Sequence, residues 1–240
     1  MTTRKTLLTG WFSFLHGETT AGDELALRTV EQFLDVHGAA YDTAWSPGFR
    51  PDALHLDDAE PADYTHLVFV CGPLHGPQIE ALHERYADCY RIAVGASVIE
   101  PGSAAVRGFH RVLPRDGAEL RPGILDLAAL APPTEPVPVV GVVLTSGQGE
   151  YGPLRRHEEV AGRVTGWLAG RDCARLELDT RLDAGDWRHC ATPGQFLSAA
   201  ARLDLVVTDR LHGLVLALRS GVPALTVDPV AGGAKVSAQG

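Results

Sequence analysis

The chain has 240 residues, of which 45% are apolar and 21% are charged. This is enough to bury a substantial core, either as one large domain or as two lobes of roughly 100 residues each. The 30 acidic residues exceed the 21 basic ones and give a net charge of −9, with the basic residues scattered along the chain, which argues against nucleic acid as a partner.

Short apolar runs alternate with longer stretches of helical periodicity, and several of the runs end in glycine. This alternation is typical of βαβ units in a parallel sheet that is covered on both faces. The predicted strands are 6–9, 41–44, 67–70, 91–94, 139–144, 175–178, 205–208 and 224–227. The predicted helices include 24–36, 158–168 and 214–218.

Residues 131–138 (APPTEPVP) contain four prolines, which disfavour helix and form a stiff, extended connection. We therefore predict an α/β fold of two Rossmann-like lobes whose parallel sheets face each other across a cleft. The N-terminal lobe covers 1–130, the linker 131–138 and the C-terminal lobe 139–240. Ligands of open parallel sheets bind beyond the carboxyl ends of the strands, so the strand-to-helix turns are the candidate sites.

The first such turn, residues 10–23, contains three glycines and can bring backbone close to a ligand. Asp23 either caps the next helix or acts as a base or substrate ligand. His16 either faces the ligand or is solvated.

The second turn, residues 70–77, comes after a strongly apolar strand and resembles a strained elbow that presents Cys71, so a cysteine hydrolase is an alternative. Small residues normally flank such a nucleophile, and a helix begins directly after it. Here Val70 precedes the cysteine, and Pro73 and Pro77 interrupt the segment on its other side. A buried structural cysteine is the preferred interpretation. His75 is a further candidate ligand in this turn.

The third turn, residues 145–152 (TSGQGEYG), comes after the first strand of the second lobe. Its three glycines either cradle an anion or belong to a loose surface loop, and it lacks the lysine of a P-loop.

The fourth turn, DRLHG at 209–213, is the most specific feature. It comes after an apolar strand and leads into a nearly all-apolar helix at 214–218, which stops at GVP (221–223). A helix that is apolar on every face is expected to be packed on all sides, which would hold the turn rigidly at the edge of the sheet.

Arg210 and His212 would then lie beside free helix N–H groups, where cationic and dipolar donors converge on an anion. The alternative is structural: Arg210 would pair with Asp209 or Asp228, and His212 would bond to backbone. The first interpretation is preferred, because polar residues at the start of so apolar a helix are costly unless they have a use.

At these residues the chain resembles the polysaccharide pyruvyl transferase family. The family signature is an apolar strand, an Arg-x-His-Gly/Ala turn, an apolar helix, Gly-x-Pro, a strand and a lysine. Here it corresponds to RLHG (210–213), GVP (221–223), the strand 224–227 and Lys235. Gly22-Asp23 resembles the Gly-Asp motif that opens the family's first helix, and Arg115-Asp116 its central Arg-Asp element. The resemblance implies two lobes in the GT-B arrangement.

It also implies transfer of an enolpyruvyl unit from phosphoenolpyruvate to a sugar diol, giving a cyclic ketal and phosphate. The predicted donor-binding residues are Arg210, His212, Gly213 and Lys235. The predicted acceptor-side residues are His16, Asp23 and His75, and the predicted catalytic residues are His212 and Asp23. This chemistry needs neither a metal nor a cofactor besides the donor substrate.

Two turns depart from the family pattern. Residues 71–73 (CGP) stand where consecutive glycines are frequent, and 16–19 (HGET) where Asn-x-Gly-Asp is common. Both would face the acceptor, so either the acceptor is unusual or transfer activity has been lost. The chain also ends five residues after Lys235, where family members usually continue with helices, so a truncated and a genuine C-terminus are both open alternatives.

Two other functions stay open. A GT-B-type nucleotide-sugar glycosyltransferase would also place basic residues at helix N-termini, but it needs a ribose-binding carboxylate, and no candidate has the expected spacing. A non-catalytic sugar- or phosphate-binding relative is the other.

The N-terminus, the apolar stretches and the cysteines predict a cytoplasmic protein. A homo-oligomer is possible. Residues 1–10 resemble a first strand more than a signal peptide, and no stretch approaches the roughly 18 apolar residues of a membrane span. The four cysteines show no CxxC spacing, so neither a zinc site nor a disulfide framework is predicted.

Overall fold

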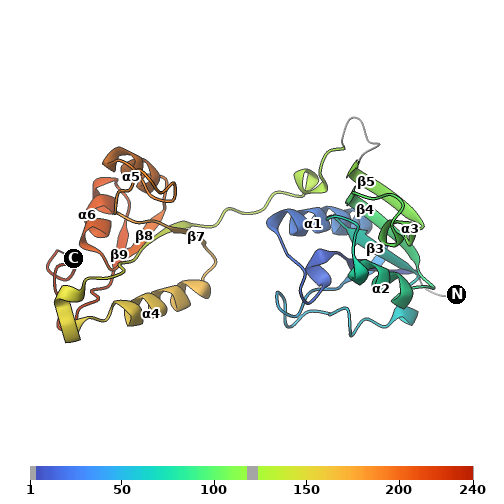
Figure 1. The fold of residues 1–240 in the computed structure, drawn as a ribbon, viewed down its shortest axis with the longest axis horizontal. Helices are drawn as coiled ribbons and strands as arrows, with labels where there is room; N and C mark the ends of the chain where they lie inside the picture. Colours follow the sequence, from blue (N-terminus) through green and yellow to red (C-terminus); the bar gives the residue numbers. More distant parts are fainter. Residues whose placement is uncertain (1–3, 118–123, 240) are drawn as a thin grey trace. The chain divides into compact units, whose positions relative to one another are not determined.

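The polypeptide passes through two parallel sheets in chain order, one on each side of the proline-rich segment (Figure 1). The computed structural model describes residues 4–117 and 124–239. The chain divides into two compact units, Met1–Thr134 and Glu135–Gly240. The boundary between them therefore falls within residues 131–138.

The first unit contains a five-stranded sheet in the order β2-β1-β3-β4-β5. Its strands are β1 (Lys5–Thr9), β2 (Ala40–Thr43), β3 (His66–Val70), β4 (Tyr90–Val98) and β5 (Arg111–Gly117). Its helices are α1 (Ala21–Val36), α2 (Pro77–Arg85) and α3 (Ala104–Arg107), with 3₁₀ turns at Trp11–Ser13, Pro61–Asp63 and Leu127–Leu130.

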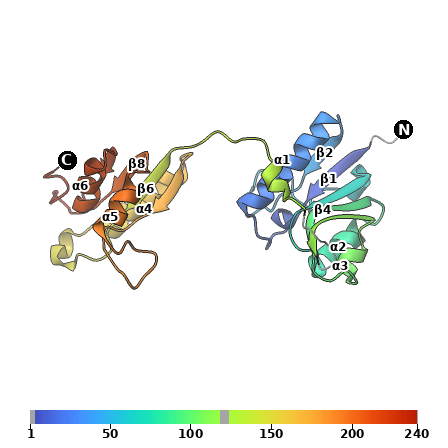
Figure 2. The ribbon, with the colours of Figure 1, turned by 90° about the horizontal axis from the view of Figure 1, so that it is seen from above.

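Both faces of this sheet are covered, by α1 on one side and by α2 and α3 on the other (Figure 2). Successive strand residues point to opposite faces. Leu7 of β1 accordingly packs in the cluster that contains Ile79 of α2, and Leu8 packs in the cluster that contains Leu27 of α1. Burial on both sides is the expected condition of a parallel sheet.

The second unit contains a four-stranded sheet in the order β7-β6-β8-β9. Its strands are β6 (Val139–Val143), β7 (Ala174–Glu177), β8 (Leu205–Thr208) and β9 (Ala224–Thr226). Its helices are α4 (His157–Ala169), α5 (Pro193–Ala200) and α6 (Leu211–Arg219), with a 3₁₀ turn at Gly149–Leu154. One core cluster joins Val142 to Val164 of α4, and a second joins Val143 to Ala217 of α6.

The predicted α/β class with two parallel sheets is confirmed. All eight predicted strands are present, with ends shifted by a few residues. The prediction missed β5, whose Arg111, Pro114, Arg115 and Asp116 leave no apolar run. This strand lies at the edge of its sheet, where charged residues and proline are tolerated.

The helix predictions were less complete. Helices 24–36 and 158–168 correspond to α1 and α4, whereas α2, α3 and α5 were not predicted. The interpretation of the prolines after Cys71 as interruptions is wrong for Pro77, which is the first residue of α2. Proline is favoured at this position, because its missing N–H would have no partner within the helix in any case.

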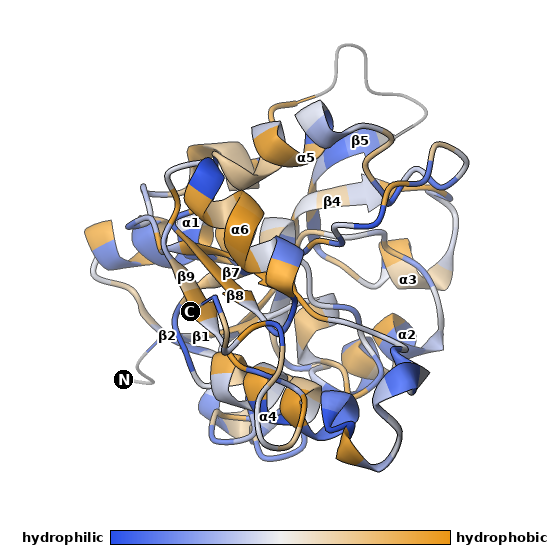
Figure 3. Cartoon of the chain, turned by 90° about the vertical axis from the view of Figure 1, so that its left-hand side faces the viewer, coloured by the Kyte–Doolittle hydropathy of each residue, from blue (hydrophilic) through white to orange (hydrophobic). Residues whose placement is uncertain are grey.

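The packing predicted for the helix at 214–218 is wrong. Figure 3 shows α6 as almost entirely hydrophobic, and Leu214 and Ala217 are buried, but Val215 is 43% and Leu218 is 57% exposed. The helix thus packs on its sheet with one face only. Packing on all sides of α6 therefore does not explain how the turn at 209–213 is held in place.

Candidate functional site

The Arg-x-His-Gly turn lies at the carboxyl end of β8, where α6 begins. Arg210 is the N-cap of α6, and its carbonyl accepts the first intrahelical bond, from the N–H of Leu214 at 3.1 Å. The N–H groups of residues 211–213 therefore point out of the helix end. Together with the helix dipole they favour an anion at this position.

Hydrogen bonds of Thr208 fix this turn. Its hydroxyl donates to the carbonyl of Val143 at 2.7 Å and accepts from the N–H of Arg210 at 3.0 Å. Gly213 packs directly on it, since a Cβ there would lie 2.2 Å from the hydroxyl oxygen. Gly213 was predicted to bind the donor; in the structure its lack of a side chain allows close packing of α6 on the end of β8.

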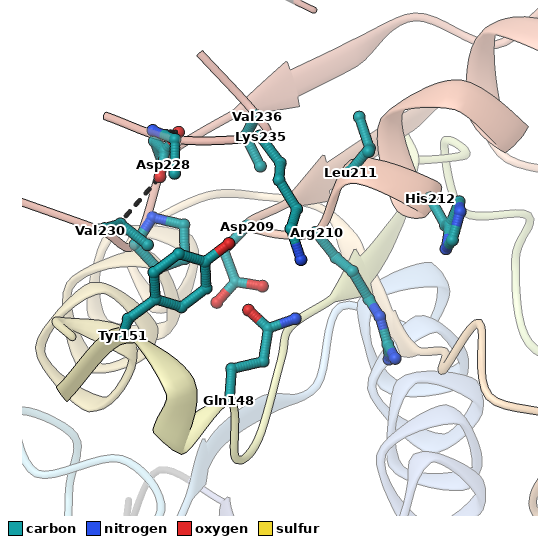
Figure 4. A pocket seen from close by; sticks show the side chains of 12 residues that line it. Gln148, Tyr151, Asp209, Arg210, Leu211, His212, Asp228, Val230, Lys235 and Val236 are labelled. Atoms are coloured by element: carbon teal, nitrogen blue, oxygen red, sulfur yellow. Dashed lines mark hydrogen bonds between the residues drawn. The ribbon is translucent and has the colours of Figure 1, made fainter. Parts of the chain in front are cut away.

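A cavity of about 230 Å³ opens in front of the turn (Figure 4). It is lined by Gln148, Tyr151, Asp209, Arg210, Leu211, His212, Asp228, Pro229, Val230, Ala234, Lys235 and Val236. The predicted donor-binding side chains Arg210, His212 and Lys235 are therefore brought to one cavity, although Lys235 lies more than twenty residues along the chain from the others.

Lys235 is presented by a turn that Asp228 holds together. The Asp228 carboxylate accepts hydrogen bonds from the N–H groups of Val230, Ala234 and Ser237 at 3.1, 2.7 and 2.9 Å. The Lys235 Nζ lies 5.5 Å from the centre of the Tyr151 ring. Asp228 is thus used for backbone bonds, and the alternative in which it pairs with Arg210 is not observed.

Arg210 pairs instead with Asp179, which lies just beyond β7. Its Nη1 lies 2.6 Å from Oδ1 of Asp179, and Arg181 donates to the same carboxylate from its backbone at 2.8 Å and its side chain at 2.9 Å. Burial alone would raise the pKa of Asp179, but the Arg181 bonds and the Arg210 charge outweigh it and hold the pKa below its ordinary value. Asp179 is an ionised carboxylate that orients Arg210.

His212 lies at the margin of the cavity and is exposed to solvent. Figure 4 shows its ring beyond Arg210, away from Tyr151 and Lys235. Its position suits contact with the outer part of a bound anion rather than with the floor of the cavity.

Asp209 lies beneath the turn and is 2% exposed. Its Oδ1 accepts the N–H of Thr145 at 2.7 Å, whereas Oδ2 finds no hydrogen-bond partner in the described part of the chain. Burial raises the pKa of this carboxyl, against the opposing effects of the Thr145 bonds and of His157 and Arg210. A group whose neutral form is favoured by burial makes folding depend on pH.

The variant Asp209→Asn is expected to be more stable than the wild type at neutral pH, relative to acidic pH. Because the folded pKa is raised, the wild-type stability is fully present below the unfolded value of about 3.9 and falls as pH rises through the folded value, by about 1.4 kcal/mol per pH unit. The amide oxygen of Asn can keep the Thr145 bond without ionising. Urea unfolding of both proteins between pH 4 and pH 7 tests this, and parallel pH profiles would contradict it.

A second cavity, of about 560 Å³, lies in the first unit. It is lined by Trp11, His16, Glu18, Thr20, Asp23, Cys71, Gly72, Pro73, His75, Gln78 and Arg115. The three predicted acceptor-side residues, His16, Asp23 and His75, therefore share one cavity. The His75 and Trp11 rings lie 5.3 Å apart and give it an aromatic wall.

The helix cap at Asp23 differs from the prediction. Thr20 is the N-cap of α1, and Asp23 is the third helical residue, whose carboxylate accepts from the N–H of Thr20 at 3.1 Å and from its hydroxyl at 2.7 Å. The two residues form a capping box. Asp23 has a structural role and also lines the cavity, so the two interpretations of this residue are compatible.

Cys71 has the strained backbone of an elbow but not the chemistry of a nucleophile. Its φ is 64°, an uncommon value for a residue with a side chain, and the residue is 6% exposed. Burial raises the pKa of its thiol, although Gly72 and Arg115 oppose the effect. The thiol is held protonated, which supports the structural interpretation. Arg115, from the predicted Arg-Asp element, lies 3.8 Å from its sulfur.

No group of three or more His, Cys, Asp or Glu side chains that could hold a metal ion occurs within residues 4–117 and 124–239. Over the same ranges, no helix is both long enough and apolar enough to cross a membrane.

Residues 174–229 match the family model described as polysaccharide pyruvyl transferase. The matched segment runs from β7 past β9, so it contains Asp179, the turn 209–213 and α6, but not Lys235. The predicted resemblance is confirmed over this segment, and it indicates a transferase.

No curated protein matches the chain. Among solved structures, E. coli heptosyltransferase WaaC with ADP is 12% identical, covers 93% of this chain and 86% of that one, and gives a TM-score of 0.27. The bacterial iron-containing dodecameric glycosyltransferase TibC from enterotoxigenic E. coli H10407 is 13% identical, covers 92% and 59%, and gives 0.23. Similarity at this level assigns no ligand to the chain.

Proposed function

We propose that this chain transfers a pyruvyl group from phosphoenolpyruvate to a sugar diol and forms a ketal. The observation that carries the proposal is the cavity at the end of β8, where Arg210, Lys235 and the N-terminus of α6 converge. Arg210 and α6 lie in the segment that matches the pyruvyl transferase model. In a chain of net charge −9, such a local concentration of positive charge indicates an anionic ligand.

Phosphoenolpyruvate carries a carboxylate and a phosphate, so its site needs several donors of hydrogen bonds and positive charge. Arg210 can bind one anionic group through two N–H groups while Asp179 holds its other edge. Lys235 and the N–H groups of residues 211–213 can bind the second. Asp179 and Asp228 keep Arg210 and the turn of Lys235 in place before phosphoenolpyruvate binds.

The reaction needs an acid and two sugar hydroxyls. Protonation of the donor's methylene carbon leaves an oxocarbenium-like centre at C2, and one hydroxyl attacks that centre and loses its proton. The C–O bond to phosphate then breaks, His212 supplies a proton to the leaving phosphate, and the second hydroxyl closes the ring with loss of its proton. Asp23 and the aromatic wall of the first-unit cavity are the proposed acceptor side.

Ligand binding separates this function from the alternatives. Isothermal titration calorimetry with phosphoenolpyruvate and, separately, with nucleotide sugars is expected to give binding of the first only. Phosphate release that requires both phosphoenolpyruvate and a saccharide, monitored by ³¹P NMR, would establish transfer. Binding of nucleotide sugars alone would favour a glycosyltransferase, and binding without turnover on any saccharide would favour a non-catalytic relative.

Replacing His212 with alanine is expected to lower turnover by about 100-fold, because general acid catalysis contributes roughly 10²–10⁴. The side chain is exposed, so the thermal midpoint should not change. Steady-state kinetics with phosphoenolpyruvate would show the loss in kcat rather than in KM. Normal turnover would rule out the acid role.

A further inference from the structure

Gln148 has a backbone conformation that glycine would adopt more easily. Its φ is 59° and its ψ is 51°, in the left-handed region, and glycines stand on both sides of it. Among residues 4–117 and 124–239, Cys71 and Gln148 are the non-glycine residues with positive φ, and each lines one of the two cavities described above. A non-glycine residue kept in this conformation is a candidate for a functional side chain, which its contacts must then support.

The side chain of Gln148 is held by a buried histidine. His157, the first residue of α4, is 1% exposed, and its Nε2 lies 3.2 Å from Oε1 of Gln148. An amide oxygen only accepts, so Nε2 carries the hydrogen. The Nδ1 of His157 has no hydrogen-bond partner among the described residues. In this arrangement His157 engages the oxygen end of the Gln148 amide.

With its oxygen engaged by His157, the amide leaves its nitrogen free to donate. Figure 4 shows the amide of Gln148 inside the cavity, with Asp209 and Lys235 above it and its nitrogen on the side of Arg210. Lys235 and the N–H groups at the start of α6 are further donors at this place, beside the buried carboxyl of Asp209. An additional neutral donor suits a ligand rich in oxygen lone pairs.

We propose that Gln148 is an oxyanion-binding residue of this cavity and that His157 is its positioning residue. The amide N–H groups donate to an anionic oxygen of the ligand, which is a phosphorylated carboxylic acid if the proposed function holds. Only the identity of the ligand as phosphoenolpyruvate rests on the proposed function; the role of Gln148 in binding an anion does not. The strain at Gln148 is then the cost of placing a rigid donor opposite Lys235.

The experiment measures the dissociation constants of phosphoenolpyruvate and of inorganic phosphate by titration calorimetry, at fixed pH and ionic strength. Gln148→Ala is expected to weaken binding of phosphoenolpyruvate by about 10-fold and Gln148→Glu by about 100-fold or more, because the latter places a negative charge beside the anion. Gln148→Lys restores a donor and is expected to bind better than Gln148→Ala. Gln32→Ala, an exposed glutamine on α1 of the first unit, is the matched control and should bind as wild type.

A double-mutant cycle tests the positioning role. His157→Phe keeps the ring volume but removes the bond to Gln148, and it is expected to weaken binding by about 10-fold. If His157 acts through Gln148, the double variant binds no more weakly than Gln148→Ala alone. Additive losses would overturn the positioning role. If His157→Phe fails to fold, the contrast between the Glu and Lys variants of Gln148 still decides the anion-binding role.

The results separate this proposal from the proposed function. Binding of phosphate but not of phosphoenolpyruvate, with the expected loss of affinity in Gln148→Glu, would support the oxyanion site and refute phosphoenolpyruvate as the donor substrate. Equal dissociation constants of phosphoenolpyruvate for the Ala, Glu and Lys variants would refute the role of Gln148 but not phosphoenolpyruvate as the donor substrate. Binding of neither anion to the wild type would refute both.

Discussion

Replacing Gly213 with alanine is expected to lower the free energy of unfolding of the second unit by about 2–4 kcal/mol. The new Cβ would lie 2.2 Å from the hydroxyl oxygen of Thr208 and 2.9 Å from its Cβ. Thr208 cannot turn away without losing its bonds to Val143 and Arg210. The clash and the lost bonds therefore add, and for a unit of this size the thermal midpoint should fall by roughly 10–20 °C.

Gly166 provides the matched control. It also lies within a helix of the second unit, α4, and a Cβ there would meet nothing within 4 Å. Alanine at this position should stabilise the protein by up to about 1 kcal/mol, because alanine is the better helix former. Thermal unfolding of both variants, measured by circular dichroism, checks the pair. Equal midpoints would show that α6 can move away from β8 at little cost.

The opposite responses expected of these two glycines illustrate what the sequence can and cannot predict. Both stand in helical segments with similar neighbours. They differ because Gly213 faces the end of a strand and Gly166 faces solvent. The resemblance singled out Gly213 as part of a signature, but only the structure gives the reason, which is contact with Thr208.

Strands β1, β3, β6 and β8 were predictable because each contains a short apolar run whose residues are mostly buried. The edge strand β5 and the helix α2 were not, since the first is polar and the second begins with a proline that was interpreted as a break. Hydrophobic patterning reports burial, and an edge strand or a short helix with one buried face leaves little of it.

In the candidate site, residues that are close in sequence were predicted, whereas residues that come from other parts of the chain were missed. Arg210, His212 and Gly213 lie within four residues and were predicted together. Asp179, which binds Arg210, lies 31 residues away and was missed, and Gln148 was regarded only as part of a glycine-rich loop. Both belong to the connections after β7 and β6, the strands that continue the sheet beyond β8. A search of every strand end for charged side chains would have included Asp179.

Replacing Arg210 with alanine is expected to reduce kcat/KM for phosphoenolpyruvate by about 100-fold or more while leaving the fold nearly unchanged. A charge-assisted bond to an anion contributes roughly 1.5–3 kcal/mol, and Arg210 can make two such bonds. The loss of its pair with Asp179 costs little, because Arg181 still donates to that carboxylate from its backbone and its side chain. Steady-state kinetics and thermal unfolding of the same preparation measure the two effects.

The comparison with a surface arginine makes this result specific. Arg163 of α4 is 81% exposed and pairs with Glu159, so Arg163→Ala should change neither kcat/KM nor the thermal midpoint by a measurable amount. If Arg210→Ala lowered stability as much as activity, Arg210 would be a structural partner of Asp179 rather than a ligand of the anion. A large loss of activity at unchanged stability is the outcome that only an anion-binding role predicts, because the carboxylate left behind keeps its other donors.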